Sequence, residues 1–555
     1  MLTKLRVHPD SKLVIWVLFI CIALLELILF KYFVSHTLEH FYPISFDQAD
    51  YLQLSYRIYE NIKNSGLISG LAHSQMLHNG ILFPLHAILV FILLNASRFS
   101  ALLPNLFYFI ALQFFILFTL STYTNKKTVL FLCWGLLLCL GTPFNTVGSL
   151  FDFRMDFIAF CLYGLLITAT LHSRFFLDRK WSIITGAIAA LTILTRCITV
   201  AYILPLFTLT VLYLCLFKQR RHLALKQQLM NIGLMVCLLF ILVSPYLWLN
   251  KAAIYDYYVS THLLGNEKYI RSLEVGITDF YSYLTFYPFS LFEKHLTQLT
   301  TYYATLVLFF YALFYYLLPK QKTANHIDWI TGFIFLTLAT SLPLLILTLD
   351  VSKSSVVGSI AAIPCLWLFF WAYLYFESHI ISTSLNKKIM TTFAILIFLS
   401  GFYNQVHSLH HKISQNKQHV LTTITKMYQD IGDYAQAKHW SQVHLSVDQI
   451  VDYLTASSLT TVYYETRHIL LNAVIEKLGG TIFSITEKEA QQSLKVSNVV
   501  ILNLDHHDKI TSPYPFNQSI AQLKPFIENY TRAHFVLLGD YQLGDATYSV
   551  YVAPR

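Results

Sequence analysis

Long apolar runs recur along this chain and constrain its fold more than any other feature. The first lies at 13–34, and others follow as far as residue 404. A helix of about 20 apolar residues crosses the ~30 Å hydrocarbon core of a bilayer. Charged residues make up only 12% of the chain, which is roughly half of their share in soluble domains. We therefore predict a polytopic α-helical membrane protein. Its first run is longer than a signal-peptide core and is expected to be a retained span.

The positions of lysine and arginine predict the orientation of these spans. Lys4, Arg6 and Lys12 precede the first run, so the N-terminus is predicted to be cytoplasmic. The run at 80–95 is short and contains Pro84, and we assign it to the membrane interface. Most loop clusters of Lys and Arg then fall on the cytoplasmic side, as the positive-inside rule requires. About eleven spans are predicted, at 13–34, 100–122, 128–142, 157–173, 182–197, 199–217, 229–248, 301–318, 328–349, 356–376 and 389–404.

Composition divides the chain into two predicted parts. Residues 1–404 hold the spans, with a first outer loop at 35–98 and a second long one at 249–300. In 405–555 the apolar runs shrink to strand length and alternate with helical segments, which predicts a soluble α/β domain. We expect helices at 468–480 and 519–530, and strands at 481–485, 498–504, 534–539 and 547–553. The net charge of +9 lies largely in short loops, so it indicates orientation and no nucleic-acid partner.

A short polar stretch follows the first span. Ser45, with Gln48 three residues on, matches a helix capping box. On the helix that follows, Asp47, Asp50 and Tyr51 share one largely apolar face. Two interpretations fit these acids. They complement the helix dipole, or a partly desolvated Asp47 acts as a general base.

Further ionisable residues are predicted on the same side of the membrane. Arg154 and Asp156 stand just before a span, and Arg196 lies at the turn between two apolar runs. Lys268 and Arg271 belong to a charged cluster in the second long loop. Each has a simpler structural interpretation, namely helix capping, anchoring at the lipid headgroups or solvation. For the basic residues, anion binding is the alternative interpretation, because all of them are predicted on the same side of the membrane as the first outer loop.

This arrangement resembles the GT-C superfamily of membrane glycosyltransferases, which includes protein O-mannosyltransferases and bacterial aminoarabinose and lipopolysaccharide-sugar transferases. In that family an Asp-Glu-x-x-Tyr motif follows the first span, and Asp47 and Tyr51 match its Asp and Tyr. Asp156 is similar to a second family acid in the next outer loop, and Arg196 to a basic residue after Leu-Thr. Gln48 stands where the family has Glu, so the resemblance implies no certain cofactor and leaves a divalent metal open.

The resemblance implies a hexosyl- or pentosyltransferase that moves a sugar from a polyprenyl-phosphate carrier to a hydroxyl of a lipid, glycan or protein. It also implies a bacterial inner-membrane location with the C-terminal domain in the periplasm. Asp47 would be the general base, and attack opposite the phosphate would invert the anomeric centre. The implied substrate-binding residues are Asp156, Asp50, Tyr51, Arg154, Arg196, Lys268 and Arg271.

Two other classes of protein fit parts of the sequence. A transporter or flippase of a lipid-linked or small polar substrate needs ionisable residues in mid-span. Glu26 is the one clear case, and the other spans are nearly free of charge, which disfavours a path through the membrane. A membrane-anchored sensor would place its function in 405–555, but eleven spans exceed what an anchor needs.

Overall fold

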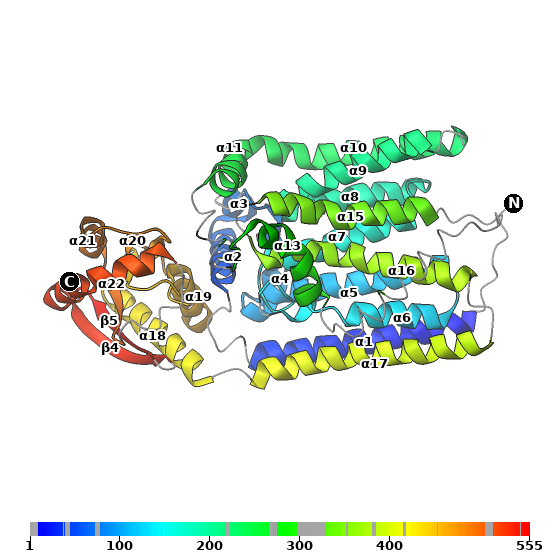
Figure 1. Ribbon diagram of the computed structural model, residues 1–555. Coiled ribbons are helices and arrows are strands. Elements are labelled where there is room, and N and C mark those ends of the chain that lie inside the picture. The colour runs from blue at the N-terminus through cyan, green and yellow to red at the C-terminus, as the bar shows by residue number, and fades with distance from the viewer. Residues whose placement is uncertain are drawn as a thin grey trace.

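The molecule consists of a long helical bundle and a smaller α/β domain at one end of it (Figure 1). The structure is a computed structural model. It describes residues 9–36, 38, 45–72, 78–145, 147–217, 222–265, 270, 272, 275–296, 306, 329–350, 353–379, 384–414, 418–451, 453–505, 514–543 and 546–554.

Apolar helices build the bundle. In the described part of the chain, 8 helical segments are long and apolar enough to cross a membrane, which makes the chain a multi-pass integral membrane protein. Helices fill every predicted span range except 301–318, which lies outside the described residues apart from the helical Leu306. The helices that run along the bundle are α1 (Pro9–His36), α5 (Arg98–Tyr123), α6 (Lys127–Leu138), α7 (Met155–His172), α8 (Arg179–Thr195), α9 (Val200–Phe217), α10 (His222–Leu249), α15 (Trp329–Leu349), α16 (Ala362–His379) and α17 (Ser384–Ser414).

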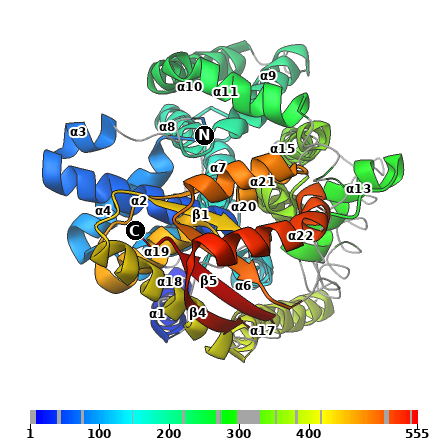
Figure 2. The ribbon, with the colours of Figure 1, turned by 90° about the vertical axis from the view of Figure 1, so that its left-hand side faces the viewer.

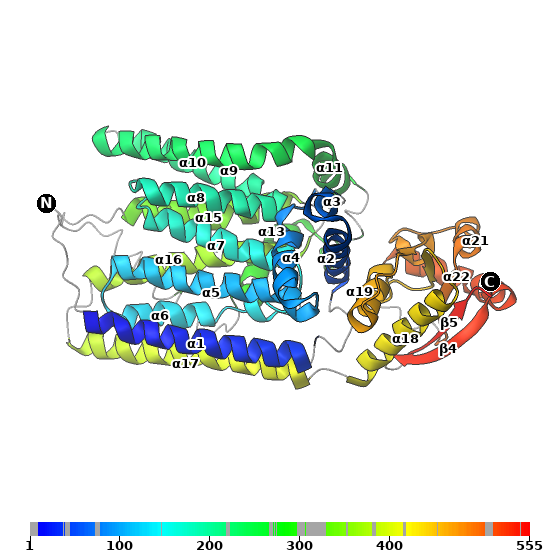
Figure 3. The same ribbon diagram turned by 180° about the vertical axis from the view of Figure 1, so that it is seen from behind.

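One end of the bundle carries a layer of shorter helices, and we call it the α2 end. Helix α2 (Phe46–Ser65) lies across it (Figures 1 and 3). The 13-residue apolar helix α4 (Leu82–Leu94) packs beside α2 and is only about 20 Å long. The other short elements at this end are α3 (Leu67–Ala72), η2 (Thr142–Phe144), η3 (Cys197–Thr199), α11 (Lys251–Tyr255), η4 (Asp256–Leu263), α13 (Phe280–Ser290), η5 (Leu291–His295) and η6 (Ser355–Ala361).

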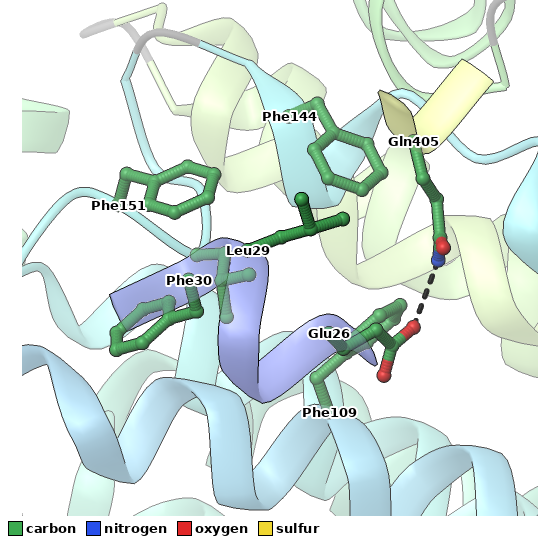
Figure 4. Close-up of a pocket in the computed structure, with 8 residues that line it drawn as sticks. Glu26, Leu29, Phe30, Phe109, Phe144, Phe151 and Gln405 are labelled. Carbon is green, nitrogen blue, oxygen red and sulfur yellow. Dashed lines mark hydrogen bonds between the residues drawn. The ribbon is translucent and has the colours of Figure 1, made fainter. Parts of the chain in front are cut away.

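A polar cluster joins the first and last long helices inside the bundle. Gln113 Nε2 donates to both carboxylate oxygens of Glu26, at 3.0 and 2.8 Å, and Gln405 Nε2 donates to Oε1 at 2.8 Å (Figure 4). Glu26 lines a small pocket whose walls include Phe30 and Phe151 (Figure 4). Because each oxygen of this buried carboxylate has an amide donor, Glu26 is accounted for by helix packing.

The C-terminal domain is built on one mixed sheet with the strand order β2-β1-β3-β5-β4. Strands β2, β1 and β3 are parallel, and β5 pairs antiparallel with β3 and β4. The strands are β1 (Val443–Val447), β2 (Ala473–Ile475), β3 (Val499–Asn503), β4 (Val536–Leu543) and β5 (Ala546–Val552). The helices are α18 (Gln418–Ala437), α19 (Ala456–Arg467), α20 (Lys477–Gly480), α21 (Glu487–Val496) and α22 (Pro515–His534).

Helices cover both faces of this sheet. Val499 and Ile501 pack in a core with α18 and α19, while Val500 and Leu502 pack with α21 and α22, as the alternation of side chains along a strand requires. The predicted fold class, a polytopic helical membrane protein with a C-terminal α/β domain, is confirmed. Two predictions inside the domain are wrong, because 468–480 contains strand β2 and 481–485 has no regular structure.

Candidate active site

Helix α2 begins at Ser45, which anchors the polar stretch to the bundle. The Ser45 side chain accepts a hydrogen bond from the Gln48 backbone N–H at 3.2 Å, so the predicted N-cap is present. The same hydroxyl donates to Asp152 Oδ1 at 2.9 Å. The Gln48 side chain is buried and its Nε2 donates to the Phe151 carbonyl at 3.5 Å. Both residues therefore bind the start of α2 to the loop that precedes α7.

That loop is held in place by a buried acid. Asp152 accepts hydrogen bonds from Ser45 and, at 2.7 Å, from the Gly148 N–H. Its main-chain carbonyl accepts from Asn105 Nδ2 at 3.1 Å. Burial raises the pKa of Asp152 to about 6, although Arg154 and these hydrogen bonds oppose the shift. Asp152 thus fixes the loop and directs the residues just after it toward α2.

The residues that follow form a chain of ion pairs. Arg154 Nη2 lies 2.6 Å from Asp47 Oδ2, and Arg154 Nε lies 3.2 Å from Asp156 Oδ2. Arg196 Nη1 contacts the other oxygen of Asp156. We call Asp47, Arg154, Asp156 and Arg196 the ion chain. It carries two acids and two guanidiniums and is balanced in charge.

Exposure varies along the ion chain. The Asp156 side chain is 3% exposed, the two arginine side chains are 15% exposed, and the Asp47 side chain is 41% exposed. Burial lowers the pKa of Arg154, but Asp47 and Asp152 outweigh it and raise the pKa above the usual value. Asp47 is therefore the exposed end of an otherwise largely buried ion chain.

Residues of the first loop position Arg196. The Asn79 carbonyl accepts from the Cys197 N–H at 2.8 Å. Gly80 lies against the Thr195 carbonyl, and a Cβ built there would stand 2.3 Å from that oxygen. Tyr258 OH donates to Asn79 Oδ1 at 3.4 Å. The turn between α8 and α9 is thus tied to the first loop on both sides of Arg196.

Tyr51 and Asp50 leave α2 in different directions. Tyr51 packs edge-on against Phe83 at 5.3 Å. Burial raises the pKa of Tyr51, and the nearby charge of Asp47 raises it further. The Tyr51 hydroxyl is therefore close enough to the ion chain to interact with it electrostatically. Asp50 instead accepts a hydrogen bond from Ser457 of the C-terminal domain, and burial raises the pKa of Asp50 to about 6. The structure brings Asp47, Tyr51, Arg154, Asp156 and Arg196 together and turns Asp50 away.

The remaining predicted residues, Lys268 and Arg271, lie outside the described residues. The same loop contributes an aromatic group that the sequence did not single out. The Tyr257 ring lies 4.2 Å from His78 and 4.5 Å from His262, and His262 Nδ1 lies 3.5 Å from Asp350 Oδ1. The one signal in the sequence is that the loop at 249–300 is rich in tyrosine. Nothing in the sequence links it to residues so distant in the chain.

The ion chain does not fit a metal site. Its exposed acid, Asp47, faces a guanidinium, and Gln48 is turned toward a backbone carbonyl. In the described part of the chain, no three His, Cys, Asp or Glu side chains gather as metal ligands would. Divalent cations bind where several oxygen ligands converge, and here guanidiniums occupy that position.

Comparison with solved structures identifies the fold. The crystal structure of ArnT from Cupriavidus metallidurans in the apo state superposes with a TM-score of 0.59 at 10% identity, over 97% of this chain and 98% of that chain. The same protein bound to undecaprenyl phosphate gives a TM-score of 0.58 at 11% identity, with the same coverage. An Archaeoglobus fulgidus oligosaccharyltransferase, tethered to an acceptor peptide containing the NVT sequon, gives 0.51 at 11% identity, over 91% of this chain and 70% of that chain.

These proteins are GT-C glycosyltransferases. The present chain therefore has the GT-C fold, as the sequence resemblance implied. ArnT, an aminoarabinose transferase, matches it over nearly the full length of both chains, including the C-terminal domain. No protein-family profile and no curated protein sequence matches the chain.

Proposed function

We propose that this chain is a glycosyltransferase that moves a hexosyl or pentosyl group from a polyprenyl-phosphate carrier to a hydroxyl of a lipid, glycan or protein acceptor. The observation that carries the proposal is the ion chain at the α2 end of a bundle with the GT-C fold. One accessible carboxylate and two guanidiniums lie there in contact. These are the groups that an attacking hydroxyl and a departing phosphate require.

Asp47 is the proposed general base. The acceptor hydroxyl loses its proton as its oxygen attacks the anomeric carbon, and a carboxylate within hydrogen-bond reach takes that proton. Oδ2 of Asp47 faces Arg154, and the side chain is 41% exposed, so the carboxylate is oriented at one oxygen and accessible to a hydroxyl. The contact with the Arg154 guanidinium orients this acid.

Arg154 and Arg196 are the proposed anion-binding groups. The bond between the anomeric carbon and the phosphate oxygen of the carrier breaks, and its electron pair leaves with the phosphate. N–H donors and positive charge stabilise this leaving anion. A guanidinium has five N–H donors in a planar fork, more than the acids of the ion chain occupy. Asp156 lies between the two arginines and holds both. Attack of the acceptor oxygen opposite the departing phosphate inverts the anomeric centre.

The proposed location follows from the charges in the loops. In the described part of the chain, Lys126, Lys127, Arg174, Arg179 and Lys180 lie at or beside helix ends opposite the α2 end, which favours a cytoplasmic position for that end and for the N-terminus. The α2 end and the C-terminal domain would then face the periplasm of a bacterial inner membrane.

The decisive experiment is the variant Asp47→Asn. The purified protein is reconstituted with a synthetic polyprenyl-phosphate sugar and a hydroxyl acceptor, and sugar transfer is measured. We expect the rate to fall by about 10²–10⁴, the usual contribution of a general base. The variant keeps the shape of the side chain, so its melting temperature is expected to stay near that of the unchanged protein.

The control is Asp256→Asn, an exposed acid in the first turn of η4, which is expected to leave transfer unchanged. Full activity in the Asp47→Asn protein would remove Asp47 as the base. Uptake of a lipid-linked sugar into vesicles without any transfer would support a transporter instead. The hydrogen bonds from Gln113 and Gln405 to Glu26 weigh against that alternative, because they tie its one mid-span acid into helix packing.

A further inference from the structure

The C-terminal domain contacts the same helix that presents Asp47. Its helix α19 lies beside α2 at the end of the bundle (Figures 2 and 3). Thr461 Oγ1 donates to the Ala49 carbonyl at 3.2 Å, and Ala49 is fully buried. Ser457 donates to the carboxylate of Asp50. Both contacts fall within three residues of Asp47, so α19 braces the first turn of α2.

About one turn further along α19, a buried ion pair joins Glu465 of that helix to Arg98 at the start of α5. Arg98 Nε donates to Glu465 Oε1 at 3.1 Å, and Arg98 Nη2 contacts the other oxygen. The side chains of Arg98 and Glu465 are 1% and 8% exposed. Tyr56 OH, from α2, donates to Glu465 Oε1 at 2.8 Å. Arg98 Nη1 also donates to the Leu38 carbonyl at 2.5 Å, which connects the pair to the segment after α1.

Aromatic contacts extend the fastening. The Tyr56 and Tyr464 rings stack with centroids 4.6 Å apart, and Tyr464 OH donates to Glu60 Oε1 at 2.7 Å. One helix of the C-terminal domain therefore contacts α2 near its start at Ala49, at its middle at Tyr56, and one turn further on at Glu60. The bidentate ion pair between Arg98 of α5 and Glu465 of α19 defines both distance and angle, and Tyr56 of α2 donates to the same carboxylate.

We propose that Glu465 is a positioning residue for the transfer reaction: Arg98 of α5 fixes its carboxylate, and the carboxylate holds α2 through Tyr56, so that Asp47 stays in register with Arg154. The proposal rests on the function proposed above and gives the C-terminal domain a part in it. Asp47 meets the ion chain from α2, whereas Arg154 and Asp156 are held by α7 and its preceding loop. A shift of α2 therefore changes the geometry of the site directly. Misplacement by about 1 Å costs up to about 10²-fold in rate.

Two variants test this role. Glu465→Gln keeps the size of the side chain but removes the charge that pairs with Arg98. Thr461→Val is nearly isosteric and removes only the hydroxyl that donates to Ala49. We expect kcat to fall about tenfold or more in Glu465→Gln and less in Thr461→Val, with KM for the lipid-linked donor nearly unchanged, because geometry and not donor contact is altered. The matched control is Arg467→Gln on the same helix, whose pair with Asp433 is exposed.

A role that is only structural is separated by a double-mutant cycle. If Glu465 acts through Asp47, then Glu465→Gln causes no further loss of rate in an Asp47→Asn background, since coupled residues are not additive. Independent, additive losses, or wild-type kcat in both Glu465→Gln and Thr461→Val, would overturn the positioning role. Thr461→Val keeps the test decisive if Glu465→Gln does not fold. An active Asp47→Asn protein would instead refute the proposed base, so the two failures are distinct.

Discussion

Replacing Gly80 with alanine tests how tightly the turn at Arg196 is held. Gly80 has φ +146°, and a Cβ there would lie 2.3 Å from the Thr195 carbonyl oxygen. Ordinary contact begins at 3.4 Å, so the turn must retreat by 3.4 − 2.3 = 1.1 Å. The atoms that this Cβ would meet belong to the backbone of Leu194 and Thr195, and the retreat therefore moves the main chain just before Arg196. A displacement of about 1 Å in a positioning element lowers rates by up to about 10²-fold.

The expected result is a large loss of kcat with a smaller loss of stability. Strain in a glycine-only backbone region costs about 1–3 kcal/mol, which thermal unfolding in detergent measures. Sugar transfer from a polyprenyl-phosphate donor reports kcat. The control is Gly276→Ala, since Gly276 also has a positive φ (+76°) but no described atom lies within 4 Å of the position that a Cβ would take there. Equal activity of the Gly80→Ala and Gly276→Ala proteins would refute the reasoning that this turn positions Arg196.

Three further outcomes are expected. Burial raises the pKa of Asp50 from 3.8 to about 6, so the folded state favours the protonated acid and loses this stabilisation as pH rises from about 4 through 6. Asp50→Asn should therefore be more stable than the unchanged protein at pH 8, by about 1–3 kcal/mol, and not at pH 4; the same melting difference at both pH values would contradict this. Arg154→Lys should lower kcat about 10–100-fold, because a single ammonium cannot replace the fork that contacts both Asp47 and Asp156; a wild-type rate would show that the fork is dispensable. Treatment with EDTA should leave transfer unchanged, because the ion chain does not fit a metal. Activity that is lost on adding the chelator and restored by Mg²⁺ or Mn²⁺ would show that transfer requires a metal.

The bundle was predictable from the sequence because its determinants are local. A long apolar run that crosses a bilayer forms a helix, because only a helix satisfies its backbone hydrogen bonds within the segment. The charges in the loops between such runs indicate which loops share a side of the membrane. Asp47, Arg154, Asp156 and Arg196 could be selected on that basis, since each follows or precedes a span. Their pairing could not, because it depends on how α2, α7 and the turn after α8 pack at the α2 end.

The contacts of the C-terminal domain were not visible in the sequence. Arg98 and Glu465 stand 367 residues apart, and neither has a neighbour in sequence that suggests a partner. Asp50 was assigned to the site because it shares a helical face with Asp47. The structure buries α2 between the bundle and α19, so two acids three residues apart contact different domains.

The wrong secondary-structure predictions have a similar cause. Strand β2 is only three residues long, Ala473–Ile475, and is an edge strand held by pairing with β1. A short apolar run of this kind fits a helix or a strand equally well. In 481–485, Ile485 packs under α21 and α22 without pairing to the sheet, so its apolar character reflects burial alone.

The Glu26 cluster has a consequence for how the protein is made. Gln405 follows Glu26 by 379 residues and lies on α17, which runs alongside α1 (Figures 1 and 3). Segments enter the membrane in order of synthesis, so the acid in the first helix waits for its last amide donor until nearly the whole membrane part has been translated. Closure of the bundle around Glu26 is therefore a late event in biogenesis. It precedes completion of the domain that contacts α2, and a chain truncated before α17 would keep Gln113 as donor to both oxygens of Glu26 but lack Gln405.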